Sequence, residues 1–188
     1  MFDSKTKAMD IVSADVSKDA GNDDSIKIGG VFHVECFDAE GNSKWSEDFH
    51  NLVVNVGLKD LNDKYFSGSV YTAAWYIGLV NSSATFAAGD SMTSHLGWTE
   101  NVSYTQGARP TLAFGAATTA NPSVITATSA TFTMNATATI GGAFVSTSAT
   151  KSGTTGTLFS EGNFTGGNRA VISGDTLNVT YSFSATAA

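Results

Sequence analysis

Apolar and small polar residues alternate through the last third of the chain, and this pattern constrains the fold more than any other feature. The clearest run places Leu177, Val179, Tyr181 and Phe183 at every second position, as a strand with one buried face requires. Residues 105–188 hold 19 Thr and 9 Ser, and threonine suits an exposed strand face because its β-branched side chain fits the pleat. Short strands separated by Gly-rich turns are typical of a β-sandwich or barrel.

Similar signals predict further strands upstream. A hairpin is expected over residues 31–54, with turn residues at 38–42 and with Trp45 and Phe49 on one face. Leu52–Val54 would extend or restart its second strand. Other strands are expected at 71–80, 109–114, 130–134, 136–140 and 143–145, with a single helical turn at 91–97 and a flexible loop at 151–156.

One helix is expected at about residues 55–67. Leu58, Leu61 and Tyr65 repeat at spacings of three and four, and Asn55 can cap the first turn. Gly68 stands where helices commonly end.

Charge divides the chain unevenly. Residues 1–64 carry 20 of the 27 charged side chains, while the 124 residues that follow carry seven. Residues 1–30 are predicted to form an extended or partner-ordered arm, because their sparse apolar residues could not bury themselves. Residues 31–188 are then a single β-sandwich domain. The candidate interface residues are the apolar side chains of the arm and three tryptophans: Met9, Val12, Val16, Ile26, Ile28, Trp45, Trp75 and Trp98.

Composition disfavours several classes of protein. A net charge of −7 argues against binding to nucleic acid or to an anionic membrane surface, since both need clustered Lys and Arg. The longest strongly apolar stretch, residues 71–80, is half of what a transmembrane helix requires, which is about 20 residues. Cys36 is the single cysteine, which leaves no disulfide framework or Cys-based zinc site. The first residues lack the apolar core of a secretory signal, so we expect synthesis in a cytoplasm.

Candidate catalytic and metal-binding groups are few, and each has a more ordinary interpretation. His33 and His50 could face each other across the hairpin, near Glu35 or Asp48, but no metal-ligand spacing supports a site. Cys36 alternates with apolar residues and is expected to be buried.

The remaining polar candidates are no stronger. Ser94, His95 and Glu100 are the residue types of a hydrolytic triad without its usual sequence context. Asp90 and Asp175 are expected to cap their own turns. We therefore predict no catalytic residue, no metal, no cofactor and no enzyme activity. The alternative is a wall-degrading hydrolase that uses His95 and Glu100.

Several segments resemble a family of virion proteins from tailed bacteriophages, the head decoration or cement proteins. They are residues 51–58, 74–80, 88–92, 94–100, 141–144, 153–158 and 173–181, so the resemblance spans roughly residues 31–186. Residues 1–30 have no counterpart in it.

The resemblance implies a jelly-roll-like antiparallel β-sandwich with one short helix, bound to the exterior of an icosahedral capsid. The implied partners are the major capsid protein and further copies of this chain, as a dimer or trimer. Binding would stabilise the capsid by clamping neighbouring capsomers. The alternative is a tail or fibre component that binds a host surface glycan through Trp98 and Tyr104, since aromatic rings stack on sugars.

Overall fold

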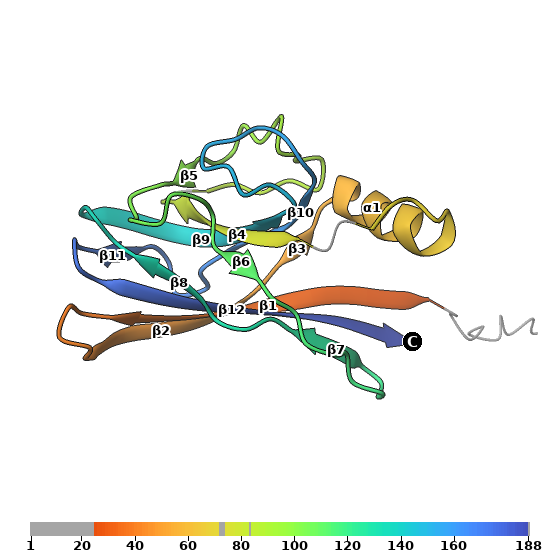
Figure 1. Cartoon of the computed structure of the whole chain (residues 1–188), viewed down its shortest axis with the longest axis horizontal. Helices are drawn as coiled ribbons and strands as arrows, with labels where there is room; N and C mark the ends of the chain where they lie inside the picture. Colours follow the sequence, from red (N-terminus) through yellow and green to blue (C-terminus); the bar gives the residue numbers. More distant parts are fainter. Residues whose placement is uncertain (1–24, 72–73, 83, 188) are drawn as a thin grey trace, which may run out of the picture.

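The computed structural model describes residues 25–71, 74–82 and 84–187, and these form two antiparallel sheets packed face to face (Figure 1). One sheet has the order β2-β1-β12-β7, with β8 also pairing with β12. Its strands are β1 (Ile26–Phe37), β2 (Ser43–His50), β7 (Ser123–Thr126), β8 (Ala130–Thr133) and β12 (Thr176–Ala187). The predicted mainly β sandwich with one helix is confirmed, and the jelly-roll connection pattern stays a prediction.

The second sheet has the order β3-β10-β9-β4-β5, with β11 pairing with β9 and β6 with β4. Its strands are β3 (Leu52–Val53), β4 (Trp75–Asn81), β5 (Glu100–Asn101), β6 (Thr111–Leu112), β9 (Ala138–Ser146), β10 (Leu158–Asn163) and β11 (Arg169–Val171). Leu52 and Val53 therefore restart a strand in the other sheet rather than extending the hairpin.

The first and last strands of the domain pair with each other over twelve residues. Phe32 lies opposite Tyr181 and Val34 opposite Val179, and all four side chains are buried. The alternation in residues 176–184 thus marks a strand with one buried face, as the sequence predicted. The expected arm was too long, because residues 26–30 belong to β1, where their backbone pairs with residues 183–187 of β12. Residues 1–24 lie outside the described part of the chain.

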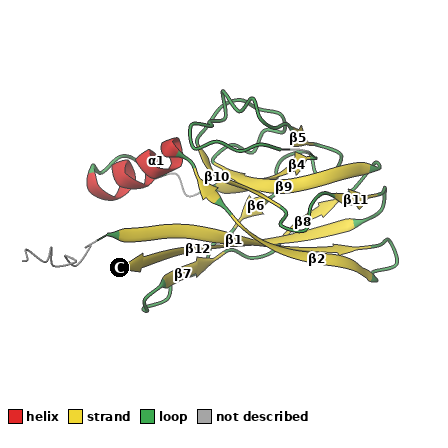
Figure 2. Cartoon of the chain, turned by 180° about the vertical axis from the view of Figure 1, so that it is seen from behind, coloured by secondary structure: helices red, strands yellow, loops and turns green. Residues whose placement is uncertain are grey.

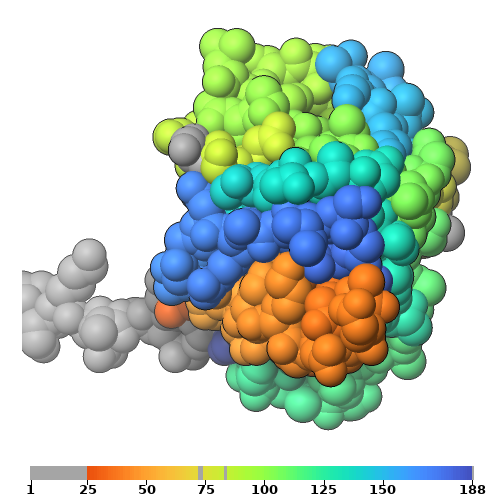
Figure 3. Space-filling model, turned by 90° about the vertical axis from the view of Figure 1, so that its left-hand side faces the viewer, coloured from red at the N-terminus to blue at the C-terminus, as the bar shows by residue number. Residues whose placement is uncertain are grey.

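The second sheet is buried on both faces. Between the sheets lies the main core, to which Leu79 and Val145 belong. On the opposite face a smaller cluster contains Val54, Val80, Met92, Trp98, Phe144 and Leu158. Figure 3 shows the loops around residues 85–105 and 150–157 stacked above β9 at the end of the molecule that carries the β1–β2 turn. Because both faces of the sheet are covered, the sequences of β4 and β9 contain continuous runs of apolar and small residues and do not alternate between apolar and polar residues.

Gly141 and Gly142 lie inside β9, whereas the sequence predicted a break between two strands at these residues. A Cβ on Gly142 would lie 2.0 Å from the carbonyl oxygen of Gly162 on the neighbouring strand. The pair therefore permits close approach of β9 and β10, which the local sequence does not reveal.

Helix α1 (Asn55–Phe66) confirms the predicted element, with a different start. Val54 is the N-cap residue and no side chain caps the helix, so the expected cap at Asn55 was wrong. Gly57 is its one buried residue and sits directly on the backbone of Phe159 in β10. Leu61 packs on the core, whereas Tyr65 is exposed. Figure 2 shows α1 projecting at the end of the sandwich where β1 begins and β12 finishes.

Three smaller expectations also need correction. Residues 91–97 form tight turns joined by a Ser91–Ser94 bridge instead of a helical turn. Strand β4 begins at Trp75 rather than at residue 71. The loop at 151–156 was expected to be flexible, but hydrogen bonds at Lys151, Ser152 and Gly153 hold it against the domain. Among the described residues, no helix is long and apolar enough to cross a membrane.

Candidate functional site

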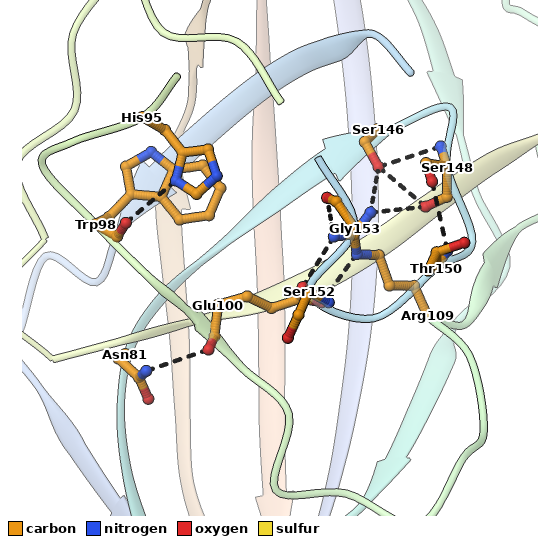
Figure 4. A network of polar contacts seen from close by, with 10 residues as sticks. All are labelled: Asn81, His95, Trp98, Glu100, Arg109, Ser146, Ser148, Thr150, Ser152 and Gly153. Atoms are coloured by element: carbon orange, nitrogen blue, oxygen red, sulfur yellow. Dashed lines mark hydrogen bonds and ion pairs between the residues drawn. The ribbon is translucent and has the colours of Figure 1, made fainter. Parts of the chain in front are cut away.

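A network of polar side chains ties together two loops on the outer face of the second sheet (Figure 4). Its centre is a two-point ion pair, in which Nε and Nη2 of Arg109 donate to the two carboxylate oxygens of Glu100, each at 2.8 Å. Both side chains are almost fully buried. Such forked pairs are geometrically specific and stronger than single charged contacts.

The remaining donors of Arg109 reach the loop that follows β9. Nη1 donates to the carbonyl oxygen of Ser148 at 2.9 Å, and Nη2 donates to that of Gly153 at 3.2 Å. The backbone N–H of Ser152 donates to Glu100 at 2.6 Å. The guanidinium group also lies 5.0 Å from the centre of the Phe144 ring. Every one of these groups is engaged within the chain, so the network holds loops in place and offers no free catalytic group.

Lys151 makes a second fixed contact from the same loop. Its ammonium group donates to the carbonyl oxygens of Tyr104 and Gln106 at 2.9 and 3.0 Å, and it lies 3.7 Å from the centre of the Tyr104 ring. Burial lowers the pKa of Lys151. These contacts explain why residues 151–156, which are rich in Gly, Ser and Thr, are held against the domain.

The expected hydrolytic residues do not form a triad. The His95 ring stacks on Trp98 at 4.0 Å between centroids, and its Nδ1 lies 3.1 Å from the carbonyl oxygen of Trp98. Glu100 is committed to Arg109, and Ser94 belongs to the turn with Ser91. A cavity of about 220 Å³ lies beside His95, Glu100 and Arg109. Its two charged lining residues, Glu100 and Arg109, are paired with each other.

Two acidic groups meet beneath Trp98. Asp90 accepts hydrogen bonds from the Trp98 indole at 3.2 Å and from the Ala87 N–H at 3.3 Å, so it caps its own turn as predicted. Glu161 of β10 is fully buried, and neither carboxyl oxygen has a hydrogen-bond partner among the described residues. Burial, and then the nearby Asp90 carboxylate, raise the pKa of Glu161 to about 8. This shift favours the protonated form of Glu161 at neutral pH.

The hairpin does not assemble the imagined metal site. His33 lies opposite Asp48, with Nδ1 and Oδ1 2.6 Å apart, while His50 lies opposite Val31. Within the described ranges, no group of three or more His, Cys, Asp or Glu side chains is placed to hold a metal ion.

Cys36 is buried as expected, and burial raises the pKa of its thiol to about 11. Asp175 caps its turn through the Ile172 N–H and also accepts a hydrogen bond from Lys44 at 2.5 Å.

An apolar groove of about 650 Å³ lies at the end of the sandwich. Its floor includes Phe159, Tyr181 and Phe183, and helix α1 forms one wall. Its rim consists of Ile26, Tyr65, Phe66 and Tyr71, which are between 65% and 81% exposed. We call these four residues the rim. Asp60 and Lys64 are the charged lining residues, and they pair with each other at 3.3 Å.

The predicted interface residues are distributed over three places. Ile26, Ile28 and Trp75 all line the groove, with Trp75 edge-on to Phe159 at 5.3 Å. Trp45 packs on Phe164 and near Arg169 on the hairpin side. Trp98 is 5% exposed, because Phe86, His95 and Phe144 surround it. Met9, Val12 and Val16 lie outside the described residues.

The exposed aromatic residues are not those that the sequence suggested. Trp98 and Tyr104, on which the glycan alternative depended, are both buried and offer no open face to a sugar ring. Tyr65, Phe66 and Tyr71 were not singled out as surface residues. A usable signal was present, since four bulky residues follow or end the helix within a short Gly- and Ser-containing stretch: Tyr65, Phe66, Val70 and Tyr71.

Comparison with models of known protein families finds no match. Searches against curated proteins and against solved structures likewise find none.

Proposed function

We propose that this chain is a structural virion protein that binds the outside of an icosahedral phage capsid and stabilises it by clamping neighbouring capsomers. The observation that carries the proposal is the rim, a cluster of large apolar side chains exposed at one end of the sandwich. Exposed apolar clusters mark interaction sites. The resemblance to decoration proteins suggests two partners for this surface: the major capsid protein and further copies of this chain.

The physical logic suits a surface protein present in many copies. A ligand that binds only the assembled shell stabilises that state by mass action, and many weak contacts on one particle act together. The pinned loops above β9 give such a protein a rigid outer face, because Arg109 and Lys151 fix them from within.

The first test is the copy number of this chain in purified particles, measured by quantitative mass spectrometry against the major capsid protein. We expect hundreds of copies in each particle. A dozen or fewer would place the protein at the tail or a vertex and would overturn its assignment to the capsid surface. Complete absence from particles would overturn the proposal altogether.

The same particles allow a test of the rim. Shells stripped of this protein are incubated with purified wild type, with the double variant Tyr65→Ser/Phe66→Ser, or with Leu96→Ser as the matched control. Leu96 is fully exposed but does not line the groove. We expect the rim variant to lose most of its binding and the control to bind like wild type. Equal binding by all three proteins would show that the rim is not the contact.

A further inference from the structure

The apolar groove is open at the place where the described chain begins. Ile26 and Ile28 of β1 both line it, and Ser25 is the first described residue. Twenty-four residues precede Ser25. The segment that leads into the groove wall is therefore the nearest chain available to cover it.

The sequence of that segment matches the groove in chemistry. Met9, Val12 and Val16 repeat at spacings of three and four, with Ile11 beside them. This spacing predicts one apolar face on a short helix, which is too short to be stable alone and needs a surface to pack on. The groove offers such a surface, since its charged lining residues, Asp60 and Lys64, neutralise each other.

The residues between the apolar face and the groove allow the chain to turn back. Residues 17–24 include Gly21, Asn22, Asp23 and Asp24, all of which favour turns. Val16 is ten residues from Ile26, a stretch that spans up to about 33 Å when extended. The arm can therefore reach the groove of its own chain without straining β1.

We propose that in the free protein residues 9–16 lie in the apolar groove of their own chain, as a tethered helix that covers its floor. Because the segment belongs to the same chain, its effective concentration at the groove is on the order of millimolar, far above the concentration of separate copies in a dilute solution. The tether therefore favours the protein's own arm over the arm of a second copy. This inference concerns the free protein and does not depend on the capsid proposal.

The test compares full-length proteins that differ only in the arm, so that the folded domain is unchanged. Met9→Asp/Val12→Asp/Val16→Asp removes the apolar face, and Lys5→Ser/Lys7→Ser/Lys18→Ser is the control with three changes at polar positions. The readout is the fluorescence of 8-anilinonaphthalene-1-sulfonate, a dye that binds open apolar grooves. We expect low dye binding by wild type and control, and a several-fold increase for the aspartate variant. Equal dye binding by all three proteins would overturn the proposal.

A disulfide trap distinguishes the protein's own groove from that of a second copy. Val12→Cys is combined with Tyr65→Cys on the rim, or with Leu96→Cys as the control away from the groove. Cys36 is buried and does not compete. We expect mild oxidation to give an internally linked monomer for the rim pair and little linkage for the control. Disulfide-linked dimers, or a wild-type dimer that dissociates in the aspartate variant, would show that the arm crosses to a neighbour and would overturn the proposal.

Discussion

At the scale of single residues, Glu161 is the least satisfied group of the described domain. Its carboxyl group is fully buried beside Asp90, and its pKa rises from an ordinary 4.5 to about 8. The folded protein therefore binds more protons than the unfolded chain between these two pH values. Linkage then requires the free energy of unfolding to decrease as pH rises through this window. One pKa unit corresponds to about 1.4 kcal/mol, so the loss has an upper limit of about 5 kcal/mol.

The variant Glu161→Gln should remove most of this pH dependence, since an amide does not ionise. We expect it to be clearly more stable than wild type at pH 9 and much closer to it at pH 5. Glu40→Gln, which changes an exposed carboxylate in the β1–β2 turn, is the control and should follow the wild-type profile. The measurement is the free energy of unfolding in urea at several pH values. Parallel profiles for wild type and Glu161→Gln would contradict the prediction.

At the scale of elements, the sequence predicted those strands and turns whose pattern lies within one short segment of the chain, and it missed features that depend on contacts between distant segments. Strand β12 and the β1–β2 hairpin follow from alternation and from turn residues that are neighbours in the chain. Gly141–Gly142 was misread because its role depends on Gly162, on another strand. The candidate groups were similarly limited. The role of Arg109 could not be predicted from its sequence neighbours, because the carbonyl groups that it binds, on Ser148 and Gly153, are 39 and 44 residues away in the chain.

Helix α1 provides an element-scale prediction, because its attachment depends on one residue. A Cβ at position 57 would lie 2.4 Å from the carbonyl oxygen of Phe159, a backbone atom that cannot move aside cheaply. Gly57→Val should therefore lift the helix and destabilise the protein by about 1–3 kcal/mol, the usual cost of overpacking. Asn62→Val places the same residue on an exposed position of α1 and should stay within about 0.5 kcal/mol of wild type.

Urea denaturation of both variants provides the measurement, with dye binding as a second readout. Because α1 forms a wall of the groove, Gly57→Val should also change dye binding, whereas Asn62→Val should not. If the two valine variants lost the same stability, the loss would reflect helix propensity alone and the contact with Phe159 would be unimportant.

At the scale of the whole molecule, the second sheet joins two clusters that would otherwise be separate. Phe144 belongs to the outer cluster and Val145, the next residue of β9, belongs to the main core. Leu79 and Val80 divide in the same way on β4. The first and last strands of the domain, β1 and β12, are central neighbours in the other sheet and pair along their full length. Strands β4 and β9 contribute side chains to both clusters, so disrupting either cluster also destabilises the strands from which the other is built.

We therefore predict that the domain unfolds in one cooperative transition. Far-ultraviolet circular dichroism reports both sheets, and near-ultraviolet dichroism reports packed aromatic rings, including Trp98 in the outer cluster and Trp75 beside the main core. The two signals should give coincident thermal transitions, and the calorimetric and van't Hoff enthalpies should agree. A protein lacking residues 1–24 should retain this single transition, because the described strands and both clusters lie beyond the deletion. An earlier loss of the near-ultraviolet signal would show that the loops above β9 melt separately, and that the Arg109–Glu100 pair fixes them less firmly than its geometry indicates.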